Sequence, residues 1–429
     1  MKRRQFLTSA AAGALGAGLP LSAGTARPKS VIPDDVPRIR EYRTLGRTGF
    51  RISDLCAGSI MDEGVLGRAL DSGMNYIDSA EEYPGHHRVV ARTLKGRDRT
   101  KIFVTTKLEV QADKSKEGFL KRARKCLEEL ETEYVDCLLM HMPERPETLD
   151  TPGFHDAMRE LKAEGRVKCV GASHHGSFWL RAPEMGMDSV LLAAAEDGRF
   201  DLFLLAYNFL QMDRGDRVLA ACREKNIGAV LMKTKPVGIY YSLKSRVENL
   251  ESEKKDVNPL IREGLERYKE MIEKAESFIH DNNLGSPEEI QAAAVRFCLD
   301  NPDVSSICCR AANYDELESY LRLSGTRTNG ADKAVLASYK DGCGALYCRH
   351  ACGVCEPACP HGVPVNTILR YNHYFAAQGR EREAMEFYAA IPGVRADACA
   401  ACPGYCESAC PYGVPAKGML LLAHSQLTL

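Results

Sequence analysis

Eight cysteines near the C-terminus form two runs with closely matched spacing. The first run holds Cys348, Cys352, Cys355 and Cys359, and the second holds Cys399, Cys402, Cys406 and Cys410. In each run a proline follows the last cysteine, and the phrase Cys-Glu-x-Ala-Cys-Pro-x-Gly-Val-Pro recurs 51 residues later. Closely spaced thiolates on tight loops are the ligands of [4Fe–4S] clusters. The spacing therefore predicts two such clusters and a role in electron transfer.

The two runs resemble those of bacterial ferredoxins, in which the fourth cysteine of each run binds the other cluster. The resemblance implies one cluster bound by Cys348, Cys352, Cys355 and Cys410, and a second bound by Cys399, Cys402, Cys406 and Cys359. Each run carries one inserted residue relative to the bacterial spacing. Cys-x2-Cys pairs also bind structural zinc, so zinc and paired disulfides are alternatives. Cys343 is a candidate spare ligand.

The N-terminus has the features of an export signal. Lys2, Arg3 and Arg4 precede an apolar stretch rich in Ala and Gly, and Ala26 follows as a small-residue cleavage site. Residues 1–26 resemble a twin-arginine signal peptide; a Sec signal or an uncleaved anchor is the alternative. The twin-arginine (Tat) machinery carries folded proteins, which suits clusters assembled in a reducing cytoplasm. The resemblance implies a periplasmic or otherwise exported protein, with residues 27–41 as a linker.

Composition excludes one class of partner. Lys and Arg number 57 against 58 Asp and Glu, and removal of the signal would leave the chain weakly acidic. No long basic run is present, so we expect no nucleic-acid partner.

Between residues 42 and 325, short apolar runs alternate with longer amphipathic segments. This alternation predicts a (β/α)8 barrel closed by parallel strands, and such barrels take roughly 250 residues. The expected strands are 54–59, 75–78, 102–107, 135–141, 167–173, 202–207, 228–232 and 305–308, and the expected helices include 115–131, 153–163, 214–225 and 259–282. Residues 326–429 form a second region, which we expect to be small, mainly helical and ferredoxin-like, with helix at 331–340 and 365–388.

The barrel segment resembles the aldo/keto reductase superfamily over residues 42–325. Residues 42–49 resemble its N-terminal hairpin, and residues 73–83, Gly-Met-Asn-Tyr-Ile-Asp-Ser-Ala-Glu-Glu-Tyr, match the segment that carries its catalytic aspartate and tyrosine. The resemblance implies a catalytic tetrad of Asp78, Tyr83, Lys107 and His141, at the ends of successive strands, where barrel enzymes keep their chemistry.

The resemblance also implies a role for each member of the tetrad. Tyr83 would donate a proton to a carbonyl oxygen as hydride reaches the carbon. A phenol of pKa ~10 needs assistance near neutral pH, and Lys107, held by Asp78, would lower that pKa by its charge. His141 would orient the carbonyl.

Several positions of the nicotinamide site differ from the family pattern. Ser173-His174 stands where Ser-Asn is common, Leu204 lies in the apolar run where a glutamine is common, and Tyr320 follows Ser319 where Glu-Asn is common. Ser173, His174, Lys233 and Arg310 are the candidate cofactor-binding residues, the last two as phosphate contacts. Binding of NADP(H) is left open.

Together these features predict an iron–sulfur oxidoreductase that reduces or oxidises a small carbonyl or alcohol substrate. Its electrons would be exchanged through two [4Fe–4S] clusters, with a redox partner protein or a membrane electron donor. The alternative is an electron-transfer or binding protein in which the barrel is a non-catalytic scaffold.

Overall fold

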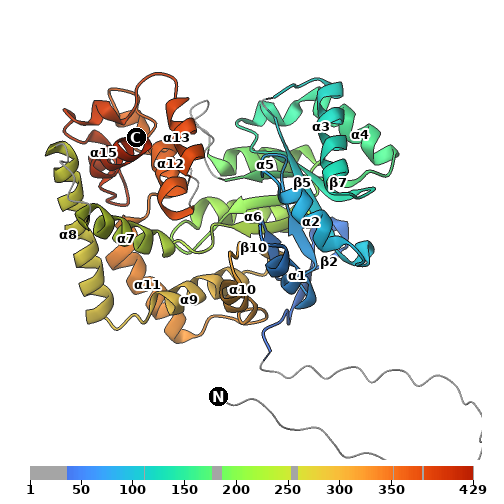
Figure 1. Ribbon diagram of the computed structural model, residues 1–429, viewed down its shortest axis with the longest axis horizontal. Coiled ribbons are helices and arrows are strands. Elements are labelled where there is room, and N and C mark those ends of the chain that lie inside the picture. Colours follow the sequence, from blue (N-terminus) through green and yellow to red (C-terminus); the bar gives the residue numbers. More distant parts are fainter. Residues whose placement is uncertain are drawn as a thin grey trace, which may run out of the picture. The chain divides into compact units, whose positions relative to one another are not determined.

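The computed structural model describes residues 36–428 apart from 111, 176–185, 253–258, 351 and 379–380. The predicted signal peptide, residues 1–26, and most of the predicted linker lie outside the described residues. Pro37–Leu429 form one compact unit (Figure 1). Ile39 is buried and its N–H donates to Ser72 O, 2.8 Å away. The packed chain therefore begins before the expected boundary at residue 42.

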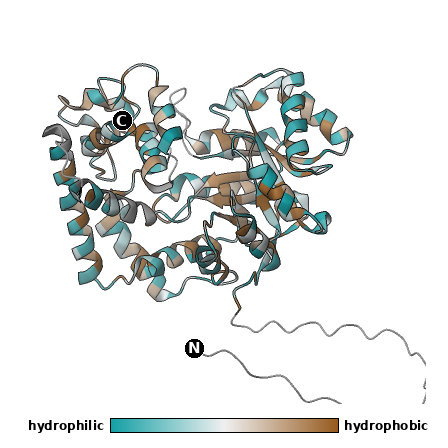
Figure 2. Cartoon of the chain, viewed as in Figure 1, coloured by the Kyte–Doolittle hydropathy of each residue, from teal (hydrophilic) through white to brown (hydrophobic). Residues whose placement is uncertain are grey.

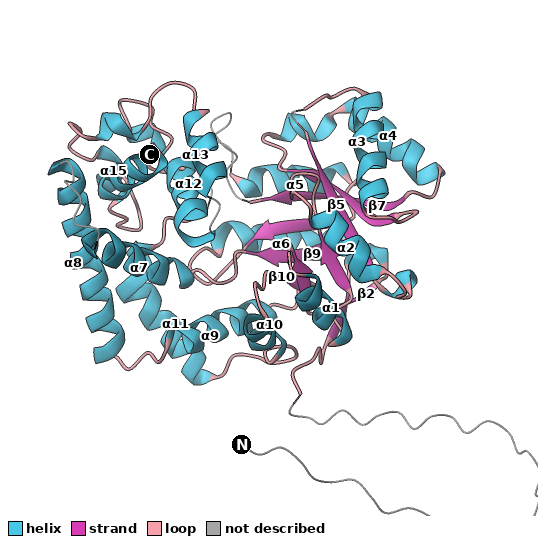
Figure 3. Ribbon diagram, in the orientation of Figure 1, coloured by secondary structure: helices cyan, strands magenta, loops and turns pink. Residues whose placement is uncertain are grey.

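Eight parallel strands close into a barrel in the order β10-β3-β4-β5-β6-β7-β8-β9 (Figure 3). This confirms the predicted (β/α)8 barrel, and each strand overlaps a predicted one. The strands are β3 (Leu55–Gly58), β4 (Tyr76–Asp78), β5 (Phe103–Glu109), β6 (Val135–His141), β7 (Val167–His174), β8 (Leu202–Ala206), β9 (Gly228–Met232) and β10 (Ser306–Cys309).

The strands are apolar on both faces because the barrel interior lies on one side and helices cover the other. Every residue of β8 and of β9 is buried, and these strands are brown in the hydropathy view (Figure 2). The helices of the barrel region are α1 (Glu63–Asp71), α2 (His86–Leu94), α3 (Lys116–Glu129), α4 (Pro152–Ala163), α5 (Met187–Asp197), α6 (Asp213–Lys225), α7 (Gly238–Ser252), α8 (Pro259–Asp281), α9 (Pro287–Asp300) and α10 (Tyr314–Leu321).

Local sequence signals set several helix starts. Asp62 and Ser115 accept hydrogen bonds from the first turns of α1 and α3. Ser286 and Glu289 form a capping box at the start of α9. Such caps satisfy N–H groups that have no partner within the helix. They fix where each helix begins and so the length of the loop before it.

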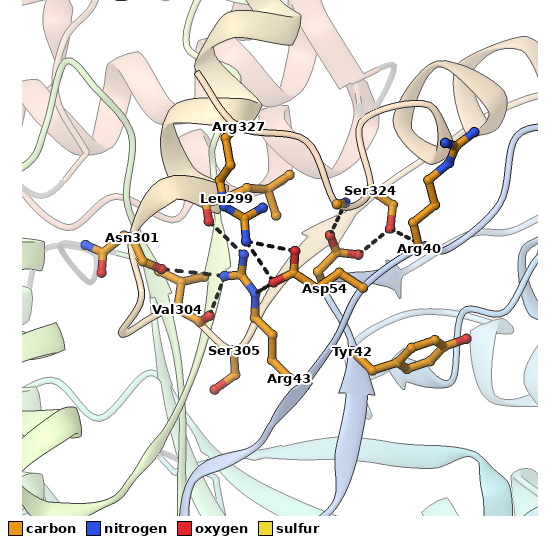
Figure 4. A network of polar contacts seen from close by, with 12 residues as sticks. Arg40, Tyr42, Arg43, Asp54, Leu299, Asn301, Val304, Ser305, Ser324 and Arg327 are labelled. Atoms are coloured by element: carbon orange, nitrogen blue, oxygen red, sulfur yellow. Dashed lines mark hydrogen bonds and ion pairs between the residues drawn. The ribbon is translucent and has the colours of Figure 1, made fainter. Parts of the chain in front are cut away.

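A hairpin of β1 (Tyr42–Thr44) and β2 (Arg51–Ser53) precedes the barrel. The Arg43 guanidinium donates to Leu299 O and Val304 O, both at 2.7 Å, and pairs with Glu41 (Figure 4). Nearby, Asp54 accepts from Ser324 Oγ at 2.6 Å. These contacts fasten the hairpin to segments about 250 residues away in the chain.

The C-terminal region is helical throughout its described elements. They are α11 (Gly330–Cys343), α12 (Val365–Gln378), α13 (Glu381–Ala389), α14 (Tyr405–Ser408) and α15 (Ala416–Leu427), with short 3-10 turns at Gly344–Leu346, Glu356–Ala358 and Ala396–Cys399. The predicted helix at 365–388 is thus two helices, α12 and α13.

The sequence repeat is also a structural repeat. Glu356 Oε1 accepts from the N–H of Asn366 at 2.8 Å, and 51 residues later Glu407 Oε1 accepts from the N–H of Lys417 at 2.9 Å. These bonds place a carboxylate at the start of α12 and of α15. Gly362 and Gly413, between each cysteine run and its helix, share a φ of 66°, which favours glycine. Each run is therefore followed by the same turn into a helix.

A second hydrophobic core joins α7 and α8 to the C-terminal helices, across the expected boundary at residue 325. It contains Tyr240 and Tyr268 from the first side and Ile368 and Leu420 from the second, all almost fully buried. Helix α15 packs on α8, and α12 on α7 (Figure 1). The C-terminal region is therefore built onto the barrel's own helices. Among the described residues, every helix is too short or too polar to span a bilayer.

Candidate active site and cysteine centre

The four residues of the predicted tetrad meet at the carboxyl ends of β4, β5 and β6. Lys107 Nζ lies 2.5 Å from Asp78 Oδ2 and donates to Ser79 O at 2.7 Å. It also lies 5.0 Å from the centroid of the Tyr83 ring. The Tyr83 and His141 ring centroids are 6.4 Å apart, with the ring planes nearly perpendicular. The sequence-predicted residues are thus brought together in one site.

Burial controls the electrostatics of this site. Burial raises the pKa of Tyr83 to about 12, although the charge of Lys107 lowers it. As predicted, the charge of Lys107 acts to lower the pKa of Tyr83. The net pKa is still raised, because desolvation of the phenolate has the larger effect. Burial also acts to lower the pKa of Lys107, but Asp78 outweighs it and the net pKa is raised. The resting site therefore holds a protonated phenol beside a charged ammonium group.

Glu82 is a site residue that the sequence analysis did not single out. Its carboxylate lies in contact with His141 Nδ1, and the contact is an ion pair when the imidazole is protonated. Burial acts to raise the pKa of Glu82, but His141 outweighs it and the net pKa is lowered. No hydrogen-bond partner for His141 Nε2 is present in the described part of the chain. This nitrogen is therefore available to a substrate oxygen.

The tetrad opens into a cavity of about 810 Å³. Its barrel wall includes Asp78, Tyr83, His141, His175, Leu204, Lys233, Lys235, Cys308, Arg310 and Tyr320. Its other wall comes from the C-terminal region, with Tyr371 and Tyr374 of α12 and Glu383 and Phe387 of α13. The sequence analysis missed this second wall, because only the packing of α12 and α13 brings these residues to the barrel mouth.

The predicted cofactor-binding residues fall into two groups. Lys233 and Arg310 line the cavity, and their role as phosphate contacts stays a prediction. Ser173 and His174 are buried in β7 and are not among the lining residues. The Ser173 hydroxyl has no hydrogen-bond partner within the described residues, but it is fully buried and does not reach the cavity. Leu204 lines the cavity where the family's glutamine is expected, so the fit to a nicotinamide is partial.

His175 is a further site residue that was missed. It lines the cavity, and its ring centroid lies 5.9 Å from that of His141. Burial lowers the pKa of His175 well below its usual range, and the charge of Lys233 lowers it further. A neutral imidazole therefore stands beside the tetrad. Its only sequence signal was its place directly after β7.

Comparison with known proteins agrees with this geometry. Residues 63–330 match the sequence model of the aldo/keto reductase family, which is more than half of the chain. The chain belongs to the aldo/keto reductase family. The predicted family is confirmed for the barrel, and the match ends before the first cysteine of the two runs.

Two bacterial proteins and one solved structure are similar to parts of this aldo/keto reductase. Methylglyoxal reductase DkgB of Escherichia coli O157:H7 is 31% identical over 107 residues, which cover 25% of this chain and 40% of that protein. The uncharacterized oxidoreductase YrpG of Bacillus subtilis (strain 168) is 25% identical over 54% of this chain and 78% of its own length. The holo form of an aldo-keto reductase from Bacillus halodurans superposes with a TM-score of 0.51 at 20% identity, over 72% of this chain and 99% of that one, which shows a shared fold.

The eight cysteines of this aldo/keto reductase form two groups. In each group, three cysteines of one run lie near the last cysteine of the other run. Burial raises the pKa of Cys348 to about 12, and nearby Cys352 and Cys410 raise it further. Burial raises the pKa of Cys399 to about 12 as well, and there the neighbouring thiols are Cys406, Cys359 and Cys402. Cys410 thus lies near the first run and Cys359 near the second, and the binding of a cluster by each group stays a prediction.

The second group surrounds a small cavity. Cys359, Cys399, Cys402 and Cys406 all line it, together with apolar residues such as Val363 and Leu420. Three sulfurs across the two groups accept hydrogen bonds: Cys348 from Asn366 Nδ2 at 3.3 Å, Cys359 from Val363 N and Cys402 from Gly404 N, both at 3.4 Å. Hydrogen bonds of this kind tune cluster potentials in iron–sulfur proteins.

Within the described ranges, no group of three or more His, Cys, Asp or Glu is arranged to hold a single metal ion. The four cysteine thiols of each group are, by their chemistry, the kind of ligand that a [4Fe–4S] cluster takes.

The first cysteine run is fixed to the barrel. Arg214 donates to Cys352 O at 3.2 Å, and Asn208 Nδ2 donates to the Tyr347 hydroxyl at 3.2 Å. Arg349 Nε donates to Leu210 O at 3.3 Å. All three barrel partners lie after β8 or in the first turn of α6. The loop that follows β8 therefore positions the first group of cysteines beside the barrel.

Proposed function

We propose that this aldo/keto reductase is an iron–sulfur oxidoreductase that reduces or oxidises a small carbonyl or alcohol, with electrons exchanged through two [4Fe–4S] clusters. The observation that carries the proposal is the shared cavity. Asp78, Tyr83 and His141 of the tetrad line one wall, and the other wall is formed by α12 and α13, which lie between the two cysteine runs.

The tetrad supplies the proton chemistry of the proposed reaction. Tyr83 holds its proton at rest and would donate it to the carbonyl oxygen as negative charge develops there. Lys107, fixed by Asp78, would stabilise the phenolate left behind. His141 Nε2 would hold the carbonyl oxygen in position, while Glu82 orients the ring through Nδ1. In the direction of oxidation, Tyr83 would accept the proton of the alcohol.

The two groups of four cysteines would hold the clusters, which supply electrons one at a time when bound. A bound NADP(H) would supply hydride. Lys233 and Arg310, which line the cavity, would contact its phosphates. Leu204 stands where the family's glutamine is expected, so the cavity fits a nicotinamide only in part.

The N-terminal twin arginines support export by the Tat machinery, which would place the protein in the periplasm or beyond. There the electrons would come from a redox partner protein or a membrane donor. Methylglyoxal reductase activity, named for one relative, makes small ketoaldehydes a sensible first substrate panel.

Metal analysis tests the cluster half of the proposal. After anaerobic purification, we expect about eight irons and eight sulfides per chain. Cys410→Ser should remove about half of the iron, because the group around Cys348 loses a ligand. Cys343→Ser is the matched control, because Cys343 is buried against Ala275 O and belongs to neither group. Zinc in place of iron would overturn the proposal.

Replacement of Tyr83 tests the catalytic half. Tyr83→Phe should lower kcat on a carbonyl substrate by about 10²–10⁴-fold, the usual contribution of a positioned acid, with the iron content unchanged. Unaltered turnover in this variant would instead favour a barrel that acts only as a scaffold. A Tyr42→Phe variant, at the far end of the barrel, controls for loss of a phenol.

A further inference from the structure

Two cysteines of the barrel are paired across neighbouring strands. Cys56 of β3 and Cys308 of β10 lie directly opposite each other in register. Directly paired residues of adjacent strands have Cα atoms about 4.8 Å apart, which is within the range of about 4.4–6.8 Å that a disulfide requires. The two thiols are close enough to interact. The Cα spacing of the pair is therefore compatible with a disulfide.

The pair faces the barrel interior at the floor of the active cavity. Gly58, two residues after Cys56 and so on the same face of the strand, lines the cavity. A Cβ on Gly58 would lie only 2.5 Å from Cys308 Sγ, so the absence of a side chain there makes room for the sulfur. Cys308 itself lines the cavity and is half-buried, whereas Cys56 is fully buried. One thiol is reachable from the cavity and the other lies directly behind it.

We propose that Cys56 and Cys308 form a reversible dithiol–disulfide site that reacts with low-molecular-weight disulfides entering the cavity. The Cys308 thiolate attacks the small disulfide, forms a mixed disulfide and releases one thiolate. Cys56 then attacks the Cys308 sulfur and loses its proton, forms the Cys56–Cys308 bond and releases the second thiolate, which takes up that proton. The protein gives up two electrons and two protons, and the small disulfide becomes two thiols.

The barrel contains an internal control. Cys137 of β6 and Cys169 of β7 are paired in the same manner, in register and in contact. Both are buried, and neither lines the cavity. The two pairs share strand geometry and differ in access, so the proposal assigns reactivity to the first pair alone.

Peptide mapping of the folded holoprotein tests the site. After incubation with oxidised glutathione, alkylation and tryptic digestion, we expect the peptide of residues 52–68 to be cross-linked to that of residues 297–310. The cross-link should disappear with dithiothreitol, be absent in Cys308→Ser and Cys56→Ser, and persist in Cys309→Ser, whose side chain points to the opposite face.

Three results would overturn the proposal: no cross-link while the protein stays folded, a cross-link that survives Cys308→Ser, or equal cross-linking of Cys137 to Cys169. The readout needs neither turnover nor iron. A failure here is therefore distinguishable from a failure of the proposed function.

Discussion

At the scale of single residues, the active site combines full burial with one balanced pair of charges. Lys107 is completely buried and would be costly there without Asp78, which lies 2.5 Å away. The same burial keeps Tyr83 protonated. A buried phenol with a raised pKa is a poor spontaneous donor, so it gives up its proton only when a substrate oxygen becomes strongly basic. This arrangement restricts proton transfer to the moment of reaction.

Acid sensitivity can be predicted for a neighbouring residue, His86. Burial lowers its pKa to about 4, and its Nδ1 lies 2.8 Å from Ser79 Oγ. Below pH 6.5 the unfolded chain binds a proton at this residue that the folded chain does not. The free energy of unfolding therefore falls as pH drops from 6.5 toward 4, by about 2 kcal/mol at pH 5.

Denaturant unfolding at pH 7 and pH 5 measures this loss. Between the two pH values, we expect the free energy of unfolding of His86→Gln to fall by about 2 kcal/mol less than that of the wild type. His280→Gln is the control, because His280 is exposed. An equal loss in His86→Gln and the wild type would show that His86 does not contribute.

At the scale of elements, one arginine makes several of the contacts that hold the hairpin of β1 and β2 to the barrel. Arg43 donates to three backbone carbonyls, those of Leu299, Asn301 and Val304, and it pairs with Glu41 (Figure 4). Arg43→Ala would leave these acceptors without their charged donor. We expect a loss on the order of 3 kcal/mol in the free energy of unfolding.

Chemical denaturation of matched arginine variants measures this contribution. Arg51→Ala is the control, because Arg51 also donates to one carbonyl, Tyr42 O, but at an exposed position. The free energy of unfolding of Arg51→Ala should fall by less than about 1 kcal/mol. Similar losses in the two variants would contradict a special role for Arg43.

The elements of the barrel were predictable because each strand carries its own signal. Val135–His141 and Gly228–Met232 were predicted with their observed bounds, since apolar runs between polar helices need no distant information. The cavity wall from Tyr371, Tyr374 and Phe387 could not be predicted, because it depends on where α12 and α13 pack. The net pKa of Tyr83 was missed for the same reason, since burial is a property of the folded chain.

At the scale of the whole molecule, the second core makes the barrel and the C-terminal region interdependent. Leu420 of α15 is fully buried in the core that also contains Tyr268 of α8. Leu420→Ala should cost about 2–5 kcal/mol. We expect hydrogen exchange to speed up in α7 and α8 as well as in α15, because they share one core.

Hydrogen exchange resolved by peptide measures how far this destabilisation spreads. Val394→Ala, at an exposed position, is the control and should leave exchange unchanged. If α15 alone lost protection while α7 and α8 kept theirs, the two regions would be independent, and the predicted division at residue 325 would be a true domain boundary.

The cavity with walls from two regions has a consequence for the order of maturation. Helices α12 and α13 are tied at both ends to cysteine runs, and the second core already packs this region on the barrel's helices. If the proposed clusters are bound, they would restrict this wall of the substrate chamber further. Loading of the proposed cofactor would then rigidify the chamber, and a chain without it would keep its fold but have a less ordered substrate site.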